Sequence, residues 1–454
     1  MPISYDGYVR GNRLVAGSTQ SGKTPAEVFE ILGAAQCTDL DIAICVVDPH
    51  AKSLAWKSLQ HLVAGSHTSR IIWDSLEELE HAPKYQFLRP SRATHSLVRA
   101  KENHQQAEQF TEVLCRRRDQ QSLATAPLTE EWAMRAAQFV LNQPRDYPAS
   151  EIRFALRPDH PKFRGLLSGC NDPDIRYEFE RVASGAVRPS QYASALRLID
   201  AVCGAPSFIA RCGTSFDLSS FYDQAGILLI QGGNIGQQVM QTIMGSIILQ
   251  TIHYIRTRRY PYPRVLLVLD EATNADLVRI HEVRALAECQ KMGLDIHILV
   301  QSLNFPSSFI TDGVLTNCIR HEWFYAANAA VARKAAEDLG DPELFNSIRS
   351  LGVAERYIKD RDSVYFEKVP RLESPHVLPE LAELETLRAI EEIYQRDEYG
   401  GNDKWPLPST GVNVTPQSSD GQCSISAQPG IISNSSPAKR LRIGGSRRSE
   451  NGDS

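Results

Sequence analysis

The eight residues GSTQSGKT at positions 17–24 constrain the fold of this chain more than any other feature. They match the pattern G-x-x-x-x-G-K-[ST], and the apolar residues 14–16 before them indicate a strand, which is the context that this motif requires. Its glycines let successive backbone N–H groups turn toward one anion, and a following helix directs the positive end of its dipole there. The alternative interpretation is a glycine-rich surface turn. The motif with its flanks predicts a phosphate-binding loop between a strand and a helix.

The loop residues have separate expected roles. Lys23 would reach the β- and γ-phosphates of a nucleotide, and the Thr24 hydroxyl would join the shell of a Mg²⁺ ion. Pro25 would stand in the first helical turn, where its missing N–H costs nothing, so the helix is expected to continue through residues 26–33. The residues predicted to surround the phosphates are Gly17, Ser18, Thr19, Gln20, Ser21, Gly22, Lys23 and Thr24.

Composition indicates a globular, cytoplasmic protein. With 454 residues, of which 42% are hydrophobic and 23% charged, the chain can bury a large core divided into two or more units. No stretch has the 18 or so apolar residues of a membrane span; residues 242–255 come nearest, but Gln250 and His253 interrupt them. The nine cysteines form no CxxC pair, which argues for reduced thiols and against a zinc site. A net charge of −5 excludes a generally basic nucleic-acid coat, although a local groove could be positive.

The order of apolar runs predicts an α/β fold with a mainly parallel sheet flanked by helices and an inserted all-α domain. Strands are expected at residues 14–16, 42–47, 70–73, 226–230, 265–269, 296–300 and 323–325, and the β-branched runs are absent from about 95 to 210. We therefore expect a first part of the core at 1–94, a helical insertion at 95–210, a second part of the core at 211–398, and a disordered tail with a basic cluster at 399–454.

Two later strands end in polar residues that would complete a hydrolytic site. The run VLLVL at 265–269 ends in Asp270 and Glu271, at the strand edge where open α/β sheets bind ligands. Asp270 would hold Mg²⁺ through water, and Glu271 would polarise the attacking water. The alternative is a buried strand followed by a helix start, which also favours acidic residues. Gln301 follows the next predicted strand and could sense the γ-phosphate or position water.

The order of these motifs resembles that of the HerA/FtsK superfamily of P-loop ATPases, which have a RecA-like fold. Within it, the arrangement is most similar to TraG/TraD-type coupling proteins of conjugation and type IV secretion. The resemblance covers roughly residues 10–375 and rests on GSTQSGKT, VVDPH, GILLIQGG, VLLVLDE, IHILVQS and LTNCIRHEWFYAANAA, in that order.

The resemblance implies an ATP-driven ring, usually of six subunits, that draws DNA through a central pore. It places an arginine that completes a neighbour's active site at Arg320, with Arg333 in reserve; either could instead be an ordinary surface charge. Its implied partners are DNA of unknown strandedness, other copies of the chain, and secretion proteins, relaxases or other DNA-processing proteins. We expect the chain to depart from this pattern, without the membrane anchor of coupling proteins, the N-terminal barrel of HerA proteins or a C-terminal winged helix.

Three basic segments could contact nucleic acid, although charge runs are more often solvated surface. The first is Cys115-Arg116-Arg117-Arg118, and the second is RTRRYPYPR at 256–264, in which aromatic residues are interleaved. The third lies in the tail and comprises KRLR at 439–442 with Arg447 and Arg448.

The leading functional hypothesis is an ATP-driven DNA translocase. The alternative is a nucleotide-gated assembly or adaptor ATPase in a secretion, mobile-element or defence complex that does not move DNA. An inactive motor fits poorly, because Lys23, Thr24, Asp270 and Glu271 are all present.

Overall fold

The computed structural model describes residues 10–37, 40–65, 67–115, 127–273, 275–361, 363–370 and 379–396. The predicted tail at 399–454 and the arginines at 116–118 lie outside these ranges.

A nine-stranded sheet forms the core, in the order β3-β4-β2-β5-β6-β1-β7-β8-β9. The strands from β3 to β7 in this order pair in parallel, and β8 and β9 continue the sheet antiparallel. The strands are β1 (Arg13–Ala16), β2 (Ile42–Asp48), β3 (Ile71–Ser75), β4 (Ile227–Gln231), β5 (Arg264–Leu269), β6 (Leu294–Val300), β7 (Arg320–Phe324), β8 (Glu355–Asp360) and β9 (Ser363–Lys368). The α/β fold with a mainly parallel sheet is thereby confirmed.

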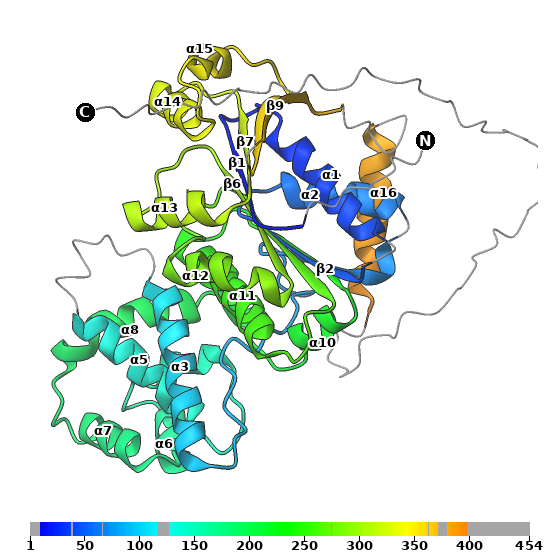
Figure 1. Cartoon of the computed structure of the whole chain (residues 1–454). Helices are drawn as coiled ribbons and strands as arrows, with labels where there is room; N and C mark the ends of the chain where they lie inside the picture. Colours follow the sequence, from blue (N-terminus) through cyan, green and yellow to red (C-terminus); the bar gives the residue numbers. More distant parts are fainter. Residues whose placement is uncertain are drawn as a thin grey trace, which may run out of the picture.

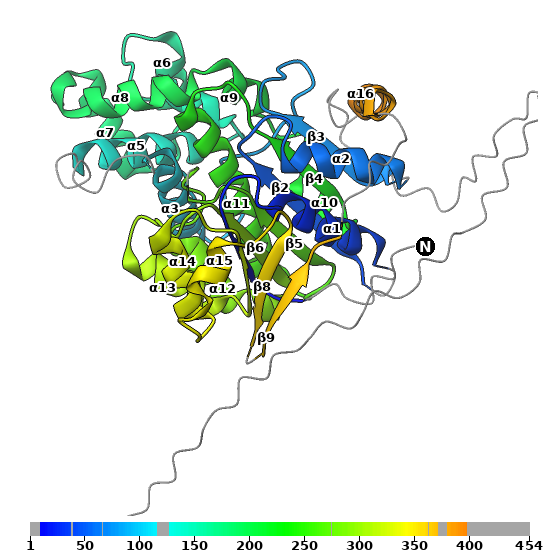
Figure 2. The ribbon, with the colours of Figure 1, turned by 90° about the horizontal axis from the view of Figure 1, so that it is seen from above.

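Helices cover both faces of the sheet, which is why its central strands are apolar throughout rather than alternating. One face carries α1 (Lys23–Gln36), α2 (Leu54–Ala64) and α16 (Pro379–Tyr394), and the other carries α11 (Gln237–Thr257), α12 (Ile280–Glu288) and α13 (Ser308–Asn317) (Figures 1 and 2). The short helices α10 (Leu218–Asp223), α14 (Ala329–Asp338) and α15 (Leu344–Arg349) complete the core. Every residue of β2, β4 and β5 is buried.

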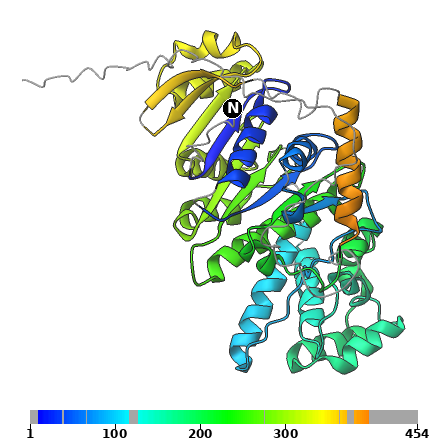
Figure 3. The ribbon, with the colours of Figure 1, turned by 90° about the vertical axis from the view of Figure 1, so that its right-hand side faces the viewer.

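An all-helical region is inserted between β3 and β4 and forms the lower part of the molecule in Figures 1 and 3. It comprises α3 (Ser96–Cys115), α5 (Pro127–Leu141), α6 (Pro161–Gly169), α7 (Pro173–Ala183), α8 (Pro189–Cys203) and α9 (Pro206–Arg211), with the 3₁₀ segment Ala149–Phe154. Its own core is aromatic: the rings of Phe139 and Phe179 stack with centroids 3.9 Å apart, and Trp132 meets Phe179 edge-on. The inserted all-α region predicted from the sequence is present, while its exact limits at 95 and 210 stay a prediction.

Helix α11 contains the apolar stretch 242–255 and is a core helix, packed against α3, α8 and α12. Within the described ranges, no helix is long and apolar enough to cross a membrane. The eight cysteines of these ranges are all free thiols.

The antiparallel hairpin β8–β9 was not predicted. Strand ERYIKD is charged at both ends and strand SVYFEK at its carboxyl end, and both are only partly buried, so no apolar run marks them. The hairpin extends the sheet beyond β7, and the loop before it reaches the phosphate-binding loop, because Ala354 N–H donates to the carbonyl oxygen of Ser21 over 2.8 Å.

Candidate functional site

The predicted site residues meet at one edge of the sheet because β2, β5, β6 and β1 are neighbours that all run in the same direction. Their carboxyl ends present Asp48, then Asp270 and Glu271, then Gln301, and finally the loop at 17–22, in this order along the edge. This edge is where open parallel sheets bind ligands.

The loop after β1 is fixed to the strands on both sides. Gly17 N–H donates to the carbonyl oxygen of Val300 at the end of β6 (3.2 Å), and Ser18 N–H donates to that of Tyr325 after β7 (2.8 Å). The Ser18 hydroxyl in turn accepts a hydrogen bond from Ala327 N–H over 2.8 Å. The loop is thus a rigid part of the sheet edge rather than a surface turn.

Both glycines of the loop motif are required sterically. A Cβ at Gly17 would lie 2.6 Å from Cβ of Phe324, and one at Gly22 would lie 2.6 Å from Cα of Ala354. Gly22 also has φ of 107°, a conformation that side chains disfavour.

The start of α1 is open to an anion. Gly22 caps the helix without a side-chain hydrogen bond, and among the described residues the N–H groups of Thr19, Gln20 and Gly22 have no acceptor. Unpaired N–H groups at a helix N-terminus, combined with the helix dipole, form an anion-binding site. The geometry fits the phosphate cradle predicted for residues 17–24.

Lys23 lies within the cradle. Its Nζ donates to the carbonyl oxygens of Gly17 (2.6 Å) and Ser18 (3.1 Å). Burial lowers the pKa of this ammonium group, and the charges of Glu271 and Asp270 oppose that effect, so the three groups are electrostatically linked. The next residue, Thr24, is half-buried in the first turn of α1.

Glu271 is held in an unusual backbone conformation. Its φ is 47°, in the left-handed region, and the following residue is fixed because Ala272 N–H donates to the carbonyl oxygen of Leu299 over 3.0 Å. The Glu271 N–H donates to Oδ1 of Asp270 (3.0 Å), and the Glu271 carboxylate accepts a hydrogen bond from Nε2 of Gln301 (2.7 Å). Strained residues of this kind concentrate at functional sites.

Asp48 joins this site, although the sequence analysis assigned it no role. It ends β2 next to Asp270 at the end of β5, and one ligand atom from each of Asp48, His50 and Asp270 lies within 4.8 Å of the others. The Asp48 carboxylate accepts hydrogen bonds from the N–H groups of His50 and Ala55, both 2.9 Å long. A signal was available, because Asp48 follows an apolar strand just as Asp270 does.

The two aspartates oppose each other's ionisation. Burial raises the pKa of Asp48 to about 6, despite the hydrogen bonds from Ala55 and His50. Burial also raises the pKa of Asp270, and the charges of Asp48 and Glu271 add to this effect. Three carboxyl groups thus converge near one ammonium group, that of Lys23. Their oxygen donors and uncompensated negative charge fit a divalent cation such as Mg²⁺.

Arg320, predicted to complete a neighbour's active site, lies at the edge of the sheet opposite to this chain's own nucleotide edge. It pairs with Arg13 in the β7–β1 register, at the start of both strands, whereas the loop follows the end of β1. Its side chain is 9% exposed, and its Nε lies 2.7 Å from Oε1 of Glu322. An arginine buried in this way is not available to a neighbouring subunit.

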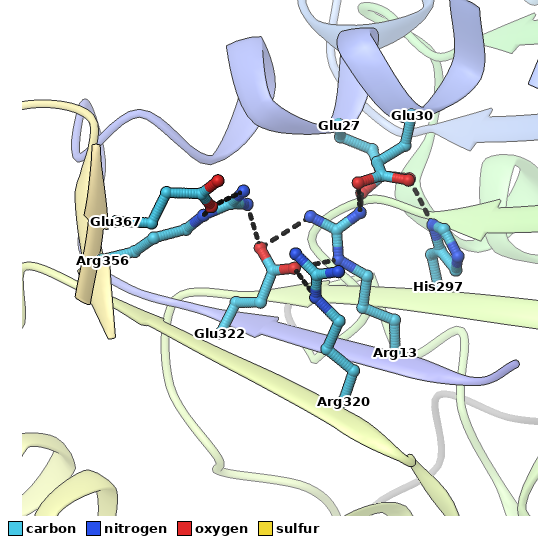
Figure 4. Close-up of polar contacts among 8 residues, drawn as sticks. All are labelled: Arg13, Glu27, Glu30, His297, Arg320, Glu322, Arg356 and Glu367. Atoms are coloured by element: carbon cyan, nitrogen blue, oxygen red, sulfur yellow. Dashed lines mark hydrogen bonds and ion pairs between the residues drawn. The ribbon is translucent and has the colours of Figure 1, made fainter. Parts of the chain in front are cut away.

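Arg320 belongs to a buried charge cluster that joins α1 to β7, β8 and β9 (Figure 4). Glu322 is surrounded by three guanidinium groups: those of Arg320, of Arg13, whose Nη2 donates over 2.6 Å, and of Arg356. Arg13 also lies 3.0 Å from Glu30 on α1. The other members are Glu27, His297 and Glu367.

The reserve candidate Arg333 is exposed on α14 and has no ion pair among the described residues. Helix α14 begins just after Ala327, which bonds to the loop residue Ser18. Arg333 therefore stays a proposal for the arginine that acts between subunits.

Two of the four arginines in the basic segment at 256–264 are neutralised by acidic residues. Arg256 pairs with Glu288 (2.9 Å) and Arg264 with Asp295 (2.7 Å), while Arg258 donates to backbone carbonyl groups. Only Arg259 is exposed without an ion pair in the described structure, and it stacks on Tyr260.

Comparison with known proteins shows which solved structures share this fold. No protein-family model matches the sequence, and no curated protein matches it. Among solved structures, the unbound form of the bacterial conjugative coupling protein TrwBdeltaN70 superposes with a TM-score of 0.56 at 12% identity, over 80% of this chain and 87% of that chain. The TrwB complex with the ATP analogue ADPNP has the same TM-score at 14% identity, over 81% and 87% of the two chains. VirB4 of Thermoanaerobacter pseudethanolicus has a TM-score of 0.52 at 13% identity, over 81% and 92%.

At these identities the likeness concerns the fold alone. It confirms that the chain has the P-loop fold of the coupling proteins that its motifs resemble, over most of its length.

Proposed function

We propose that this chain is an ATPase that works as an oligomeric, DNA-translocating motor of the coupling-protein kind. The observation that carries the proposal is the convergence of the open helix N-terminus, Lys23, Asp270, Glu271 and Gln301 on one edge of the sheet.

Each of these groups has a chemical task in phosphoryl transfer. The N–H groups of the loop and Lys23 would hold the phosphates of ATP, and Thr24 with Asp270 would hold Mg²⁺. Mg²⁺, when bound, would neutralise part of the negative charge of the phosphates. Glu271 would accept a hydrogen bond from the attacking water and orient it, while Gln301 keeps the Glu271 carboxylate in place.

The structures of related fold support the choice of nucleotide. TrwB has been solved with the ATP analogue ADPNP and with ADP and Mg²⁺, in the same fold. TrwB is a plasmid coupling protein of conjugation, which motivates DNA as the cargo and a role in DNA transfer or secretion. A homo-oligomeric ring, which we propose to be a hexamer, would place an exposed arginine such as Arg333 at the ATP of the neighbouring subunit.

A second candidate is an assembly ATPase that binds and hydrolyses ATP without moving DNA. The pairing of Arg256 and Arg264 with acidic residues favours it, because these arginines contribute no net positive charge to a DNA contact.

Steady-state ATP hydrolysis with Mg²⁺, measured with and without single- and double-stranded DNA, tests the proposal. The wild type is compared with Lys23→Ala and Glu271→Gln, and with Lys57→Ala as a control at an exposed lysine of α2. If DNA stimulates ATP hydrolysis by the wild type and the control, and this hydrolysis is lost in Lys23→Ala and Glu271→Gln, the DNA-translocating motor is supported. Hydrolysis that DNA leaves unchanged favours the assembly ATPase, and absence of hydrolysis in the wild type rejects both.

A further inference from the structure

A cavity lies where the helical insertion meets the core, away from the nucleotide edge. It has a volume of about 260 Å³ and is enclosed by α3, by α11, by the connection from β3 to α3 and by the segment that leads into α10. Sites between two structural units are common places for ligands.

The apolar wall of the cavity is aromatic. Phe87, Phe110 and Phe216 come from three separate segments, and each is at most 5% exposed. Aromatic rings that line a cavity favour a flat, unsaturated ligand, because their edges can meet the face of such a ligand.

Three polar groups of the cavity have no hydrogen-bond partner among the described residues, those of Ser246, Gln106 and Gln109. Ser246 is 5% exposed, and its hydroxyl has no hydrogen-bond partner although it lines the cavity. The amides of Gln106 and Gln109, on α3, likewise make no hydrogen bond in the described structure. A buried hydroxyl without a partner, such as that of Ser246, costs free energy, roughly 1–3 kcal/mol, so it indicates a polar atom of a ligand. The amides of Gln106 and Gln109 are only partly buried and are free to pair with donors and acceptors around the ligand's edge.

A cation stands at the rim. Arg89 is exposed, and it has no ion pair among the described residues. Burial lowers the pKa of His253 beside it, and the positive charge of Arg89 adds to this effect, which places the guanidinium group close to the cavity. The ligand would therefore carry an anionic group at the rim.

We propose that this cavity binds a nucleobase, with the attached phosphate held by Arg89. Glutamine and serine side chains can pair with the polar edge of a base, and aromatic rings stack on its face. Cavities for drug-sized ligands start at about 300 Å³, so this one takes a base-sized group and leaves sugar and phosphate outside. The site is separate from the ATP site and does not depend on the proposed function.

The base can belong to a free nucleotide or to a single strand of nucleic acid. A second hollow, which shares Ser219 and Tyr254 with the cavity, is lined by Arg259, Tyr260 and Tyr262. Tyr260 and Tyr262 are 65% and 55% exposed. They offer stacking surfaces for further bases if the ligand is a strand.

Helix α11 connects the cavity to the nucleotide edge. Ser246 lies near its middle, and earlier in the same helix Gln241 donates from Nε2 to the carbonyl oxygen of Ala275, shortly after Glu271, over 2.9 Å. A ligand in the cavity thus touches the helix that supports the segment following Glu271.

The test uses the full chain with Lys23→Ala, which removes the lysine of the phosphate-binding loop. Two probes are titrated: adenosine monophosphate carrying a fluorescent N-methylanthraniloyl group on its ribose, which leaves the base unmodified, and a labelled single-stranded deoxythymidine oligonucleotide. Arg89→Ala is added to remove the cation, and Gln109→Trp to fill the cavity. Arg164→Ala, at an exposed arginine of α6, is the matched control.

We expect saturable binding that Arg89→Ala and Gln109→Trp each weaken about tenfold or more, while Arg164→Ala leaves it unchanged. Tighter binding of the oligonucleotide identifies a strand as the source of the base, and tighter binding of the mononucleotide identifies a free nucleotide. The proposal is overturned if neither probe saturates, or if Arg89→Ala and Gln109→Trp both bind as well as the control.

Discussion

The side-chain amide of Gln301 donates a hydrogen bond to Oε1 of Glu271 over 2.7 Å, across two neighbouring strands of the sheet. Glu271 itself has φ of 47°, a conformation that costs a residue other than glycine about 1–3 kcal/mol. Backbone and amide together therefore hold this carboxylate in one orientation at the nucleotide edge.

Gln301→Ala should lower kcat for ATP hydrolysis by roughly ten- to a hundredfold while KM changes little, because the amide positions Glu271 and does not bind the phosphates. Ser302→Ala, at the next residue, is the control and should retain activity. Steady-state kinetics at saturating Mg²⁺ measures both. A raised KM with unchanged kcat would show that Gln301 contributes binding instead.

Gly22→Ala should abolish nucleotide binding, since the new Cβ would meet Cα of Ala354 at 2.6 Å in a backbone with φ of 107°. Gly340→Ala is a matched control, because Gly340 also has positive φ (76°) but a Cβ there meets nothing within 4 Å. The control should lose only about 1 kcal/mol of unfolding free energy and bind normally. Isothermal titration calorimetry with ADP and Mg²⁺ measures nucleotide binding by both variants. Equal affinities of Gly22→Ala and Gly340→Ala for ADP would refute the steric argument.

Asp48→Asn should weaken binding of the divalent cation about ten- to a hundredfold, because it removes one negative charge beside Asp270. Mn²⁺ can be titrated in the presence of ADP and followed by electron paramagnetic resonance, which needs no turnover. Asp312→Asn, at an exposed position of α13, should bind Mn²⁺ like the wild type. If Asp48→Asn did so too, the Asp48 carboxylate would have no part in holding the ion.

The parallel strands and the sheet edge that carries the candidate site could both be predicted from the sequence, because both follow from the positions of the apolar runs. Apolar, β-branched runs form the buried strands, and polar residues directly after them reach the ligand edge, as Asp270 and Gln301 do. Asp48 was missed although it carries the same signal, since a carboxylate after a strand has no defined role until the strand order places it beside Asp270.

Other features depend on three-dimensional neighbours that no local pattern reports. The hairpin β8–β9 is partly exposed and charged, so its strands lack an apolar run. Arg320 was placed by motif order, which does not reveal the end of the strand at which a residue stands; it begins β7 and so faces away from the nucleotide edge.

Arg320→Ala should therefore act on stability, whereas Arg333→Ala should act on the assembled ATPase. Removing Arg320 deprives the buried Glu322 of one of its three arginines, and the unfolding free energy should fall by a few kcal/mol. Arg333→Ala should keep wild-type stability and, if it reaches a neighbour's ATP, lower kcat by about 10³-fold or more. Urea unfolding and ATP hydrolysis measured on both variants distinguish these roles, and the opposite pattern would restore Arg320 as the arginine between subunits.

Glu322→Gln should destabilise the protein by about 3–5 kcal/mol at pH 7, because three buried arginines lose their shared carboxylate. Burial alone would raise the pKa of Glu322, but Arg13, Arg356 and Arg320 outweigh it and hold this pKa well below its usual value. A lowered pKa in the folded state means that the stabilisation is complete above the unfolded value of about 4.3 and is lost as the pH falls through the folded value.

The difference between wild type and Glu322→Gln should accordingly shrink by about 1 kcal/mol between pH 7 and pH 3.5. Urea unfolding followed by circular dichroism at both pH values measures it. Glu337→Gln, at an exposed glutamate of α14, should stay within about 0.5 kcal/mol of the wild type at pH 7. A difference that grew toward low pH would mean that the Glu322 carboxyl is protonated in the folded protein and that the arginines are balanced by Glu27, Glu30 and Glu367 alone.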